Sequence, residues 1–163
     1  MGYAVLHIDK ARSNDSGNTA HIARTYTPSN VDPSRTRLNR ELVQFPANVT
    51  NRSEAIEHRI ATAGIYRKVA KNQVKALRFI LSSSPEDMAR IEQEGLLYEW
   101  CDESMDWLRS TFGADNVVAA TLHADEDTPH IHATVVPIVT GERRKAKEEA
   151  ENGKRKYKTK KNK

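Results

Sequence analysis

Runs of apolar and β-branched residues, separated by polar segments, predict four strands in this chain. Residues 3–8 (YAVLHI), 117–122 (VVAATL) and 131–138 (IHATVVPI) have the length and composition of buried or half-buried strands. Residues 74–81 (VKALRFIL) are ambiguous by periodicity alone, but the break at residues 82–85 (SSSP) favours a strand there.

Helical spacing of apolar residues predicts two helices between these strands. Residues 53–63 place two isoleucines on one face, with Ser53 as the expected N-cap. One long helix is expected to begin at Pro85, with acids in its first turn, and to end at Gly113. Its apolar stripe is expected to face the core and comprises Met88, Ile91, Leu96, Leu97, Trp100, Met105 and Leu108.

Short strands separated by helices in this order predict an α+β domain, in which helices pack on one side of an antiparallel sheet. At 163 residues the chain is long enough for one domain with a substantial core, which we place at residues 1–140. A segment of mixed composition, residues 21–42, contains Pro28 and Pro33, which break any long helix there.

The charge is unevenly distributed along the chain. From residue 141 onward, eleven Lys and Arg stand against four Glu, whereas the first 140 residues carry fifteen basic and eighteen acidic side chains. Residues 141–163 have too little apolar content to fold alone. We therefore expect a flexible basic tail, which either binds phosphate backbones or links to a C-terminal region missing from this chain.

Composition also limits the cellular compartment. No apolar run is long enough to span a bilayer, so no membrane partner is expected. The single cysteine, Cys101, excludes an intramolecular disulfide framework and fits a reducing cytoplasm. Because Cys101 follows Trp100 inside a helical pattern, we expect a buried structural thiol.

Three histidines and three acids gather in residues 123–132 (HADEDTPHIH). His130 and His132 are two apart on a predicted strand, so they point to the same face. If the flanking strands pair as a hairpin, His123 falls opposite them and three imidazoles converge. Imidazole is a common metal ligand, and three protein ligands leave positions open for a substrate. These residues predict a metal site, although the acids between them would also keep a hairpin loop soluble.

The same segment resembles the third motif of the MobV (Pre/Mob) relaxases, which reads roughly HxDExTPHxH followed by a VVP strand. Every fixed position of that motif is met by residues 123–132 and by the strand that follows. Two earlier segments are similar to the family's N-terminal motifs HxxR and NxDPSRxxLNxEL, namely residues 21–24 (HIAR) and 30–42 (NVDPSRTRLNREL).

This resemblance implies an HUH-class relaxase with a palm-like fold. Such enzymes nick one DNA strand at a transfer origin for conjugative mobilisation and stay joined covalently to the 5′ end. The implied nucleophile is His21, whose ring nitrogen attacks phosphorus and forms a phosphoramidate. A tyrosine in the LNxEL motif is a rival candidate in this family. Arg40 stands at that position here, which leaves Tyr26 as the nearest tyrosine alternative.

The resemblance also implies roles for the other motif residues. His123, His130 and His132 would hold a divalent cation. We expect Mn²⁺ for reversible phosphoryl transfer, with Mg²⁺, Zn²⁺, Ni²⁺ or Co²⁺ as alternatives. Glu126 would either accept a hydrogen bond from His21 or serve as a fourth ligand. Arg24 would contact a phosphate bidentately, and further contacts to origin DNA are expected from Arg35, Arg37 and Asn39.

Other functions remain open from the sequence. They are a rolling-circle replication initiator or transposase-like nuclease of the same class, a three-histidine metal-binding protein without DNA chemistry, and a DNA-binding module with a structural metal. For the relaxase, the expected partner is single-stranded origin DNA in the bacterial cytoplasm, with dimerisation through a C-terminal region missing from this chain.

Overall fold

Five antiparallel strands form the centre of the fold, in the order β1-β3-β5-β4-β2. The computed structural model describes residues 2–11, 15–65 and 68–139, so the predicted basic tail at 141–163 lies outside the described part. The strands are β1 (Ala4–Ala11), β2 (Arg40–Glu41), β3 (Ala76–Ser83), β4 (Val117–His123) and β5 (His130–Val135).

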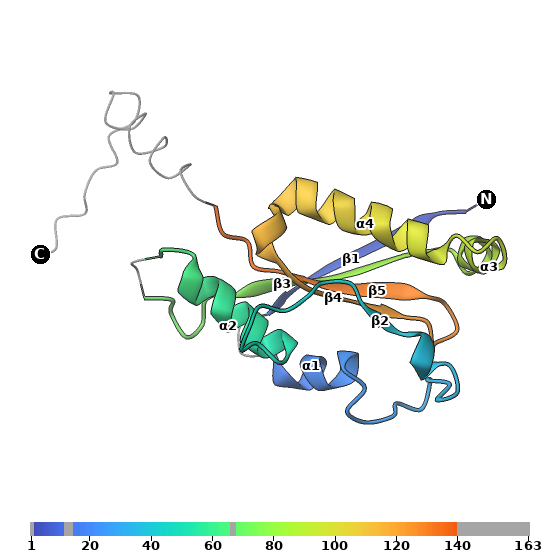
Figure 1. The fold of residues 1–163 in the computed structure, drawn as a ribbon, viewed down its shortest axis with the longest axis horizontal. Coiled ribbons are helices and arrows are strands. Elements are labelled where there is room, and N and C mark those ends of the chain that lie inside the picture. The colour runs from blue at the N-terminus through green and yellow to red at the C-terminus, as the bar shows by residue number, and fades with distance from the viewer. Residues whose placement is uncertain (1, 12–14, 66–67, 140–163) are drawn as a thin grey trace, which may run out of the picture.

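Helices cover both faces of this sheet (Figure 1). They are α1 (Ser16–Ile22), α2 (Arg52–Thr62), α3 (Pro85–Gln93) and α4 (Leu97–Phe112), with short 3-10 segments η1 (Thr36–Leu38) and η2 (Ala114–Asn116). The predicted α+β class with an antiparallel sheet is confirmed, but the placement of all helices on one side is wrong. The reason is β4, in which all seven residues are buried, so both of its faces need a cover.

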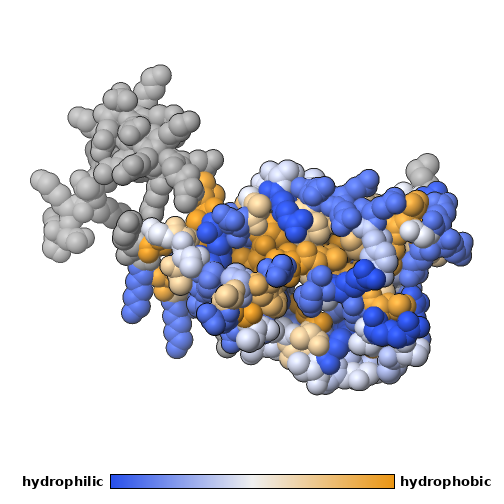
Figure 2. Space-filling model, viewed as in Figure 1, coloured by the Kyte–Doolittle hydropathy of each residue, from blue (hydrophilic) through white to orange (hydrophobic). Residues whose placement is uncertain are grey.

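Two apolar cores result from this arrangement. Between the sheet and α4, Phe79 and Leu122 pack against Met105 and Leu108. On the opposite face, Ile56 of α2 packs in a second cluster with residues of the sheet. Figure 2 shows apolar residues in a band across the middle of the view, at the level of the sheet, with polar residues above and below. None of the helices in the described ranges has the length and apolar character that a membrane crossing requires.

The long helix expected between Pro85 and Gly113 is divided into α3 and α4. Gly95 lies between them with φ +71°, a left-handed conformation that ends α3 and that glycine adopts without steric cost. Leu96 is consequently 38% exposed rather than part of the core. The expectation for Cys101 is confirmed, since this thiol is fully buried and burial raises its pKa to about 12.

The start of α2 and the whole of α1 also differ from expectation. The N-cap of α2 is Asn51, not Ser53, because the Asn51 side chain accepts a hydrogen bond from the Glu54 backbone. The Glu54 carboxylate in turn accepts from the backbone N–H of Thr50, the residue before the N-cap, so a second hydrogen bond holds the start of α2. Helix α1 has no apolar periodicity that would have predicted it. Its position depends on tertiary contacts, including the ion pair between Asp15 and Arg52 of α2.

Two glycines test this account of the backbone. Gly95→Ala forces a left-handed alanine and should lower the free energy of unfolding by roughly 1–2 kcal/mol. Gly17→Ala, in α1 with open space around the new methyl group, should raise it by up to about 1 kcal/mol. Urea denaturation of both variants measures the two changes. Equal signs would contradict the assigned conformations.

Candidate active site

The three predicted histidines meet on one face of the β4–β5 hairpin. The register pairs His123 with His130 and Thr121 with His132, as expected from the sequence. The ring centroid of His123 lies 4.7 Å from that of His132 and 5.4 Å from that of His130, and the latter two are 4.8 Å apart. Strand pairing alone therefore brings the imidazoles together.

The hydrogen bonds of His130 define which of its nitrogens is free. Its Nδ1 lies 2.9 Å from the carbonyl oxygen of Thr128, and because a carbonyl only accepts, Nδ1 must donate. Its Nε2 then carries a lone pair, which lies 3.1 Å from Nε2 of His132. Two ring nitrogens at this separation fit adjacent positions around one ion, since metal–nitrogen bonds are about 2.0–2.1 Å long for zinc.

His123 is fully buried and uses both of its nitrogens inside the protein. Its Nε2 donates to the carbonyl of Ile22 at 2.9 Å, and its Nδ1 accepts from Nη2 of Arg24 at 3.0 Å. Two overlapping sets of side chains could hold an ion: His21, His123 and His132 in one, and His123, Glu126 and His130 in the other. His123 belongs to both sets.

Burial keeps two of these imidazoles neutral. It lowers the pKa of His123 to about 4. It lowers the pKa of His132 to about 2, with a further contribution from the neighbouring rings of His130 and His123. Neutral imidazoles offer lone pairs at physiological pH, and only the neutral form binds a metal ion.

His21 approaches the cluster from the last turn of α1. Its ring centroid is 5.9 Å from that of His132 and 6.1 Å from that of His123, both in edge-on orientation. The only tyrosine alternative considered from the sequence, Tyr26, lies beside it, with the ring centroids 6.4 Å apart and Tyr26 53% exposed. The structure therefore places both candidate nucleophiles near the histidines, with His21 directly against them.

Arg24 is part of a buried ion pair rather than a free surface cation. Its Nε and Nη2 donate to the two carboxylate oxygens of Asp125 at 3.0 and 2.8 Å, and Nη2 also contacts Glu126 at 2.6 Å. This two-pronged contact occupies the face of the guanidinium that was expected to bind a phosphate. Its Nη1 donates to the carbonyl of His21 at 3.1 Å, so Arg24 fixes the end of α1 instead.

Asp125 is the residue of this site whose part in the structure the sequence analysis did not anticipate. It is fully buried and also accepts hydrogen bonds from Thr36 at 3.0 Å and from the Asn39 amide at 2.8 Å. The Asn39 carbonyl oxygen accepts from the backbone of Ala124, so both ends of this side chain are anchored within the protein. One signal was available in the sequence. Asp125 lies two residues after His123, and side chains two apart on an extended chain point to the same face.

Glu126 faces the histidines rather than His21. Its Oε1 lies 3.6 Å from Nδ1 of His123 and 3.8 Å from Nε2 of His130. Its Oε2 accepts from the side chain of Asn30 at 3.0 Å. Within the described part of the chain, no hydrogen bond joins Glu126 to His21, and the geometry matches the fourth-ligand alternative better.

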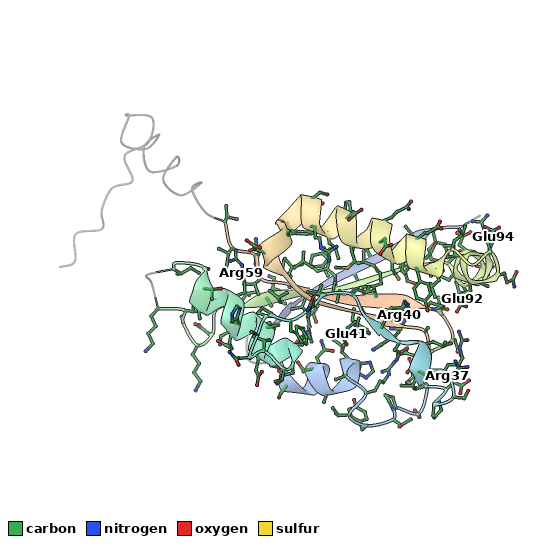
Figure 3. All side chains as sticks on the ribbon, viewed as in Figure 1. Arg37, Arg40, Glu41, Arg59, Glu92 and Glu94 are labelled. Carbon is green, nitrogen blue, oxygen red and sulfur yellow. The ribbon has the colours of Figure 1, made fainter. Side chains whose placement is uncertain are left out.

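The two remaining basic candidates differ in their surroundings. Arg35 forms an ion pair of 2.8 Å with Glu92 of α3, so its charge is partly compensated. Arg37 is exposed on the segment between α1 and β2 and forms no ion pair with any residue that the structure describes (Figure 3). Of the predicted DNA contacts, Arg37 alone presents an uncompensated charge to solvent.

Comparison with known proteins gives matches over most of the chain. Residues 1–162 match the model of the family Mob_Pre, plasmid recombination enzyme. A plasmid recombination enzyme type 3 from Staphylococcus aureus is 32% identical over 162 residues, which are 94% of this chain and 38% of that protein. The 65 kDa protein of Zymomonas mobilis is 30% identical over 137 residues, 83% of this chain and 23% of its own length. The chain thus spans well under half of these relatives.

A solved structure shares the fold. The Mn-bound crystal structure of the MobM relaxase domain (MOBV; Mob_Pre), bound to plasmid pMV158 oriT DNA at pH 5.5, matches with a TM-score of 0.75 and 25% identity. The match covers 85% of this chain and 72% of that one. The five-stranded sheet with helices on both faces therefore has a counterpart among DNA-bound relaxase domains.

The buried ion pair predicts a large effect of removing one partner. Asp125→Ala leaves Arg24 buried without its main counter-charge and should lower the free energy of unfolding by about 3–5 kcal/mol. Glu92→Ala breaks the partly exposed pair with Arg35 and should cost less than about 1 kcal/mol. Chemical denaturation of both variants compares them. Similar small losses would contradict the central role of Asp125.

The same carboxylate predicts a pH dependence of stability. Burial alone would raise the pKa of Asp125, but hydrogen bonds from Arg24, Asn39 and Thr36 outweigh it and hold the pKa well below its ordinary value. A carboxylate with a lowered pKa stabilises the fold above its unfolded pKa, about 3.9, and this contribution is lost as the pH falls towards the folded pKa.

Asp125→Asn removes this titration. The difference in unfolding free energy between wild type and Asp125→Asn should therefore be largest near neutral pH and shrink as the pH falls below about 4. Urea denaturation at a series of pH values measures the difference. A difference that grew on acidification would show that the carboxylate is not stabilised by its partners.

Proposed function

Because the chain belongs to the Mob_Pre family of plasmid recombination enzymes, we propose that it is the nicking domain of a relaxase. In this proposal it cleaves one strand of DNA at an origin of transfer and remains attached to the 5′ end, which prepares a plasmid for mobilisation. The observation that carries it is the placement of the His21 ring against the cluster of His123, His130 and His132.

The proposed reaction is a transesterification at phosphorus. A ring nitrogen of His21 attacks the scissile phosphodiester, a nitrogen–phosphorus bond forms, and the bond from phosphorus to the 3′ oxygen breaks. The 3′ oxygen leaves with the bonding electrons and takes up a proton. The 5′ phosphate stays on His21 as a phosphoramidate, which the free 3′ hydroxyl can attack to reseal the strand without ATP.

The residues present suit a divalent cation. His130, His132 and Glu126 would hold it, together with His123 once Nη2 of Arg24 releases Nδ1 of that ring. Mn²⁺ is the ion we propose, because the carboxylate suits manganese and the MobM structure is Mn-bound. When bound, the cation supplies positive charge next to the phosphate oxygens. The lowered pKa values of His123 and His132 support this role, because both rings are neutral at the pH of the cell.

Arg24 and Asp125 act as positioning residues in this proposal. Arg24 binds the carbonyl of His21 and is itself held by Asp125, so the attacking ring is fixed relative to the β4–β5 hairpin. Such fixed placement of a nucleophile contributes to rate by avoiding the entropy loss of orienting it during the reaction. We further propose that Arg37 contacts the DNA backbone, since its charge is exposed.

The assignment of His21 is tested by its removal. His21→Ala should abolish nicking of supercoiled origin plasmid in Mn²⁺, while isothermal titration with MnCl₂ shows wild-type metal affinity. Tyr26→Phe is the matched control and should nick normally. Mass spectrometry of the wild-type adduct should place the 5′ phosphate on His21.

Two results would contradict this assignment. A tyrosyl adduct on Tyr26 would transfer the role of nucleophile to that residue. A loss of Mn²⁺ affinity in His21→Ala would make His21 a metal ligand, as its grouping with His123 and His132 allows.

A further inference from the structure

We propose that an apolar shelf beside the histidine cluster binds a nucleobase of the strand that is cut. The shelf consists of Tyr3, which directly precedes β1, Val5 on β1 and Ile80 on β3. The inference rests on the proposed function, because it concerns the nucleotide next to the scissile phosphate. It adds a contact that lies away from the basic residues of the sequence motifs.

Strand register places the shelf on the same face as the metal-binding histidines. Ile80 is the direct partner of His132 on the neighbouring strand β5. On the other side of β3, Val5 pairs with Ser82, which shares the parity of Ile80. With strands about 4.8 Å apart, the shelf extends from His132 over roughly 5–10 Å, which is the scale of a single nucleotide.

The shelf forms the floor of an open cleft of about 490 Å³ that ends at the histidines. The other walls come from His21, Asn30, Glu126, Thr128, His130 and His132, and from Ser82, Ser83 and Pro85. The one ionic side chain among these described lining residues, apart from the histidines, is the acid Glu126. A channel for the phosphate backbone would be lined by Lys and Arg. This cleft instead offers apolar surface with a few hydroxyl and amide groups, which fits an uncharged, flat base.

Tyr3 has the properties of a stacking platform. Tyr3 is 61% exposed, although hydrogen bonds hold its backbone. The carbonyl of Tyr3 accepts hydrogen bonds from the backbone N–H of Ser84 and from the hydroxyl of Ser83, both at 2.9 Å. An exposed aromatic ring on a fixed backbone contributes little to the core. Stacking on a base gives such a ring a function, and every base has a face that can stack.

The inference leads to a specific order along the bound strand. The scissile phosphate lies at His21 and the histidine cluster, and the base of an adjoining nucleotide lies over Ile80 and Val5 with its face against Tyr3. The shelf lies on β1 and β3, across β5 from the loop after β4 that carries Asp125.

The test measures binding of fluorescein-labelled dT12 in MnCl₂ by anisotropy. Tyr3→Ala and Tyr3→Leu should raise the Kd by roughly tenfold, whereas Tyr3→Phe should leave it near the wild-type value. Leu6→Ala is the matched control, because Leu6 lies on the same strand, is 48% exposed and faces the opposite side of the sheet. On a 12-mer of abasic sites, wild type and Tyr3→Ala should bind equally.

The outcomes separate the shelf from the proposed function. Wild-type affinity of Tyr3→Ala and Tyr3→Leu for dT12 would overturn the shelf while leaving nicking by His21 intact. An equal loss of affinity on dT12 and on the abasic 12-mer would also overturn it, since no base would then be recognised. Wild-type protein that binds neither oligonucleotide would overturn the shelf together with the relaxase proposal.

Discussion

The buried ion pair of Arg24 with Asp125 is the constraint on which the site depends. Two opposite charges removed from water must stay together, because either one alone would cost several kcal/mol. Their partners belong to segments far apart in the sequence: the end of α1, the η1 segment and the loop after β4. Satisfying the pair therefore closes these segments around the histidine cluster. Placement of the His21 ring and folding of the hairpin loop therefore depend on the same ion pair.

The backbone at Arg24 shows how this closure is achieved. Arg24 adopts φ +54°, a left-handed conformation uncommon for a residue with a side chain, directly after the end of α1. The turn reverses the chain so that the guanidinium points back beneath the helix to the His21 carbonyl and to Asp125. Backbone strain of about 1–3 kcal/mol at such a position persists only where the surroundings enforce it. Five hydrogen bonds from one side chain do so here.

The apolar runs and the alternation of side chains along a strand were enough to predict the hairpin and the convergence of its three histidines. They were also enough for the burial of Cys101 and for four of the five strands, whereas the two-residue strand β2 was not predicted. The remaining features depend on contacts between distant segments. Helix α1 lacks an apolar stripe of its own, and Asp125 looked like a loop acid until Arg24, Thr36 and Asn39 surrounded it. The division at Gly95 was readable in principle, because glycine commonly ends a helix, but the apolar stripe on both sides concealed it.

The two elements that carry the site, strand β5 and helix α1, differ in how easily they open. Strand β5 occupies the middle of five, paired on both edges, so its amides open to exchange with solvent hydrogen only when the domain unfolds as a whole. His21 instead lies on α1, a helix of seven residues that lacks a side-chain cap at its first turn. The first turn of α1 is therefore the part of the site that opens most easily, while Arg24 holds the last turn, where His21 lies. Local opening at the start of α1 thus leaves the histidine cluster of β4 and β5 intact.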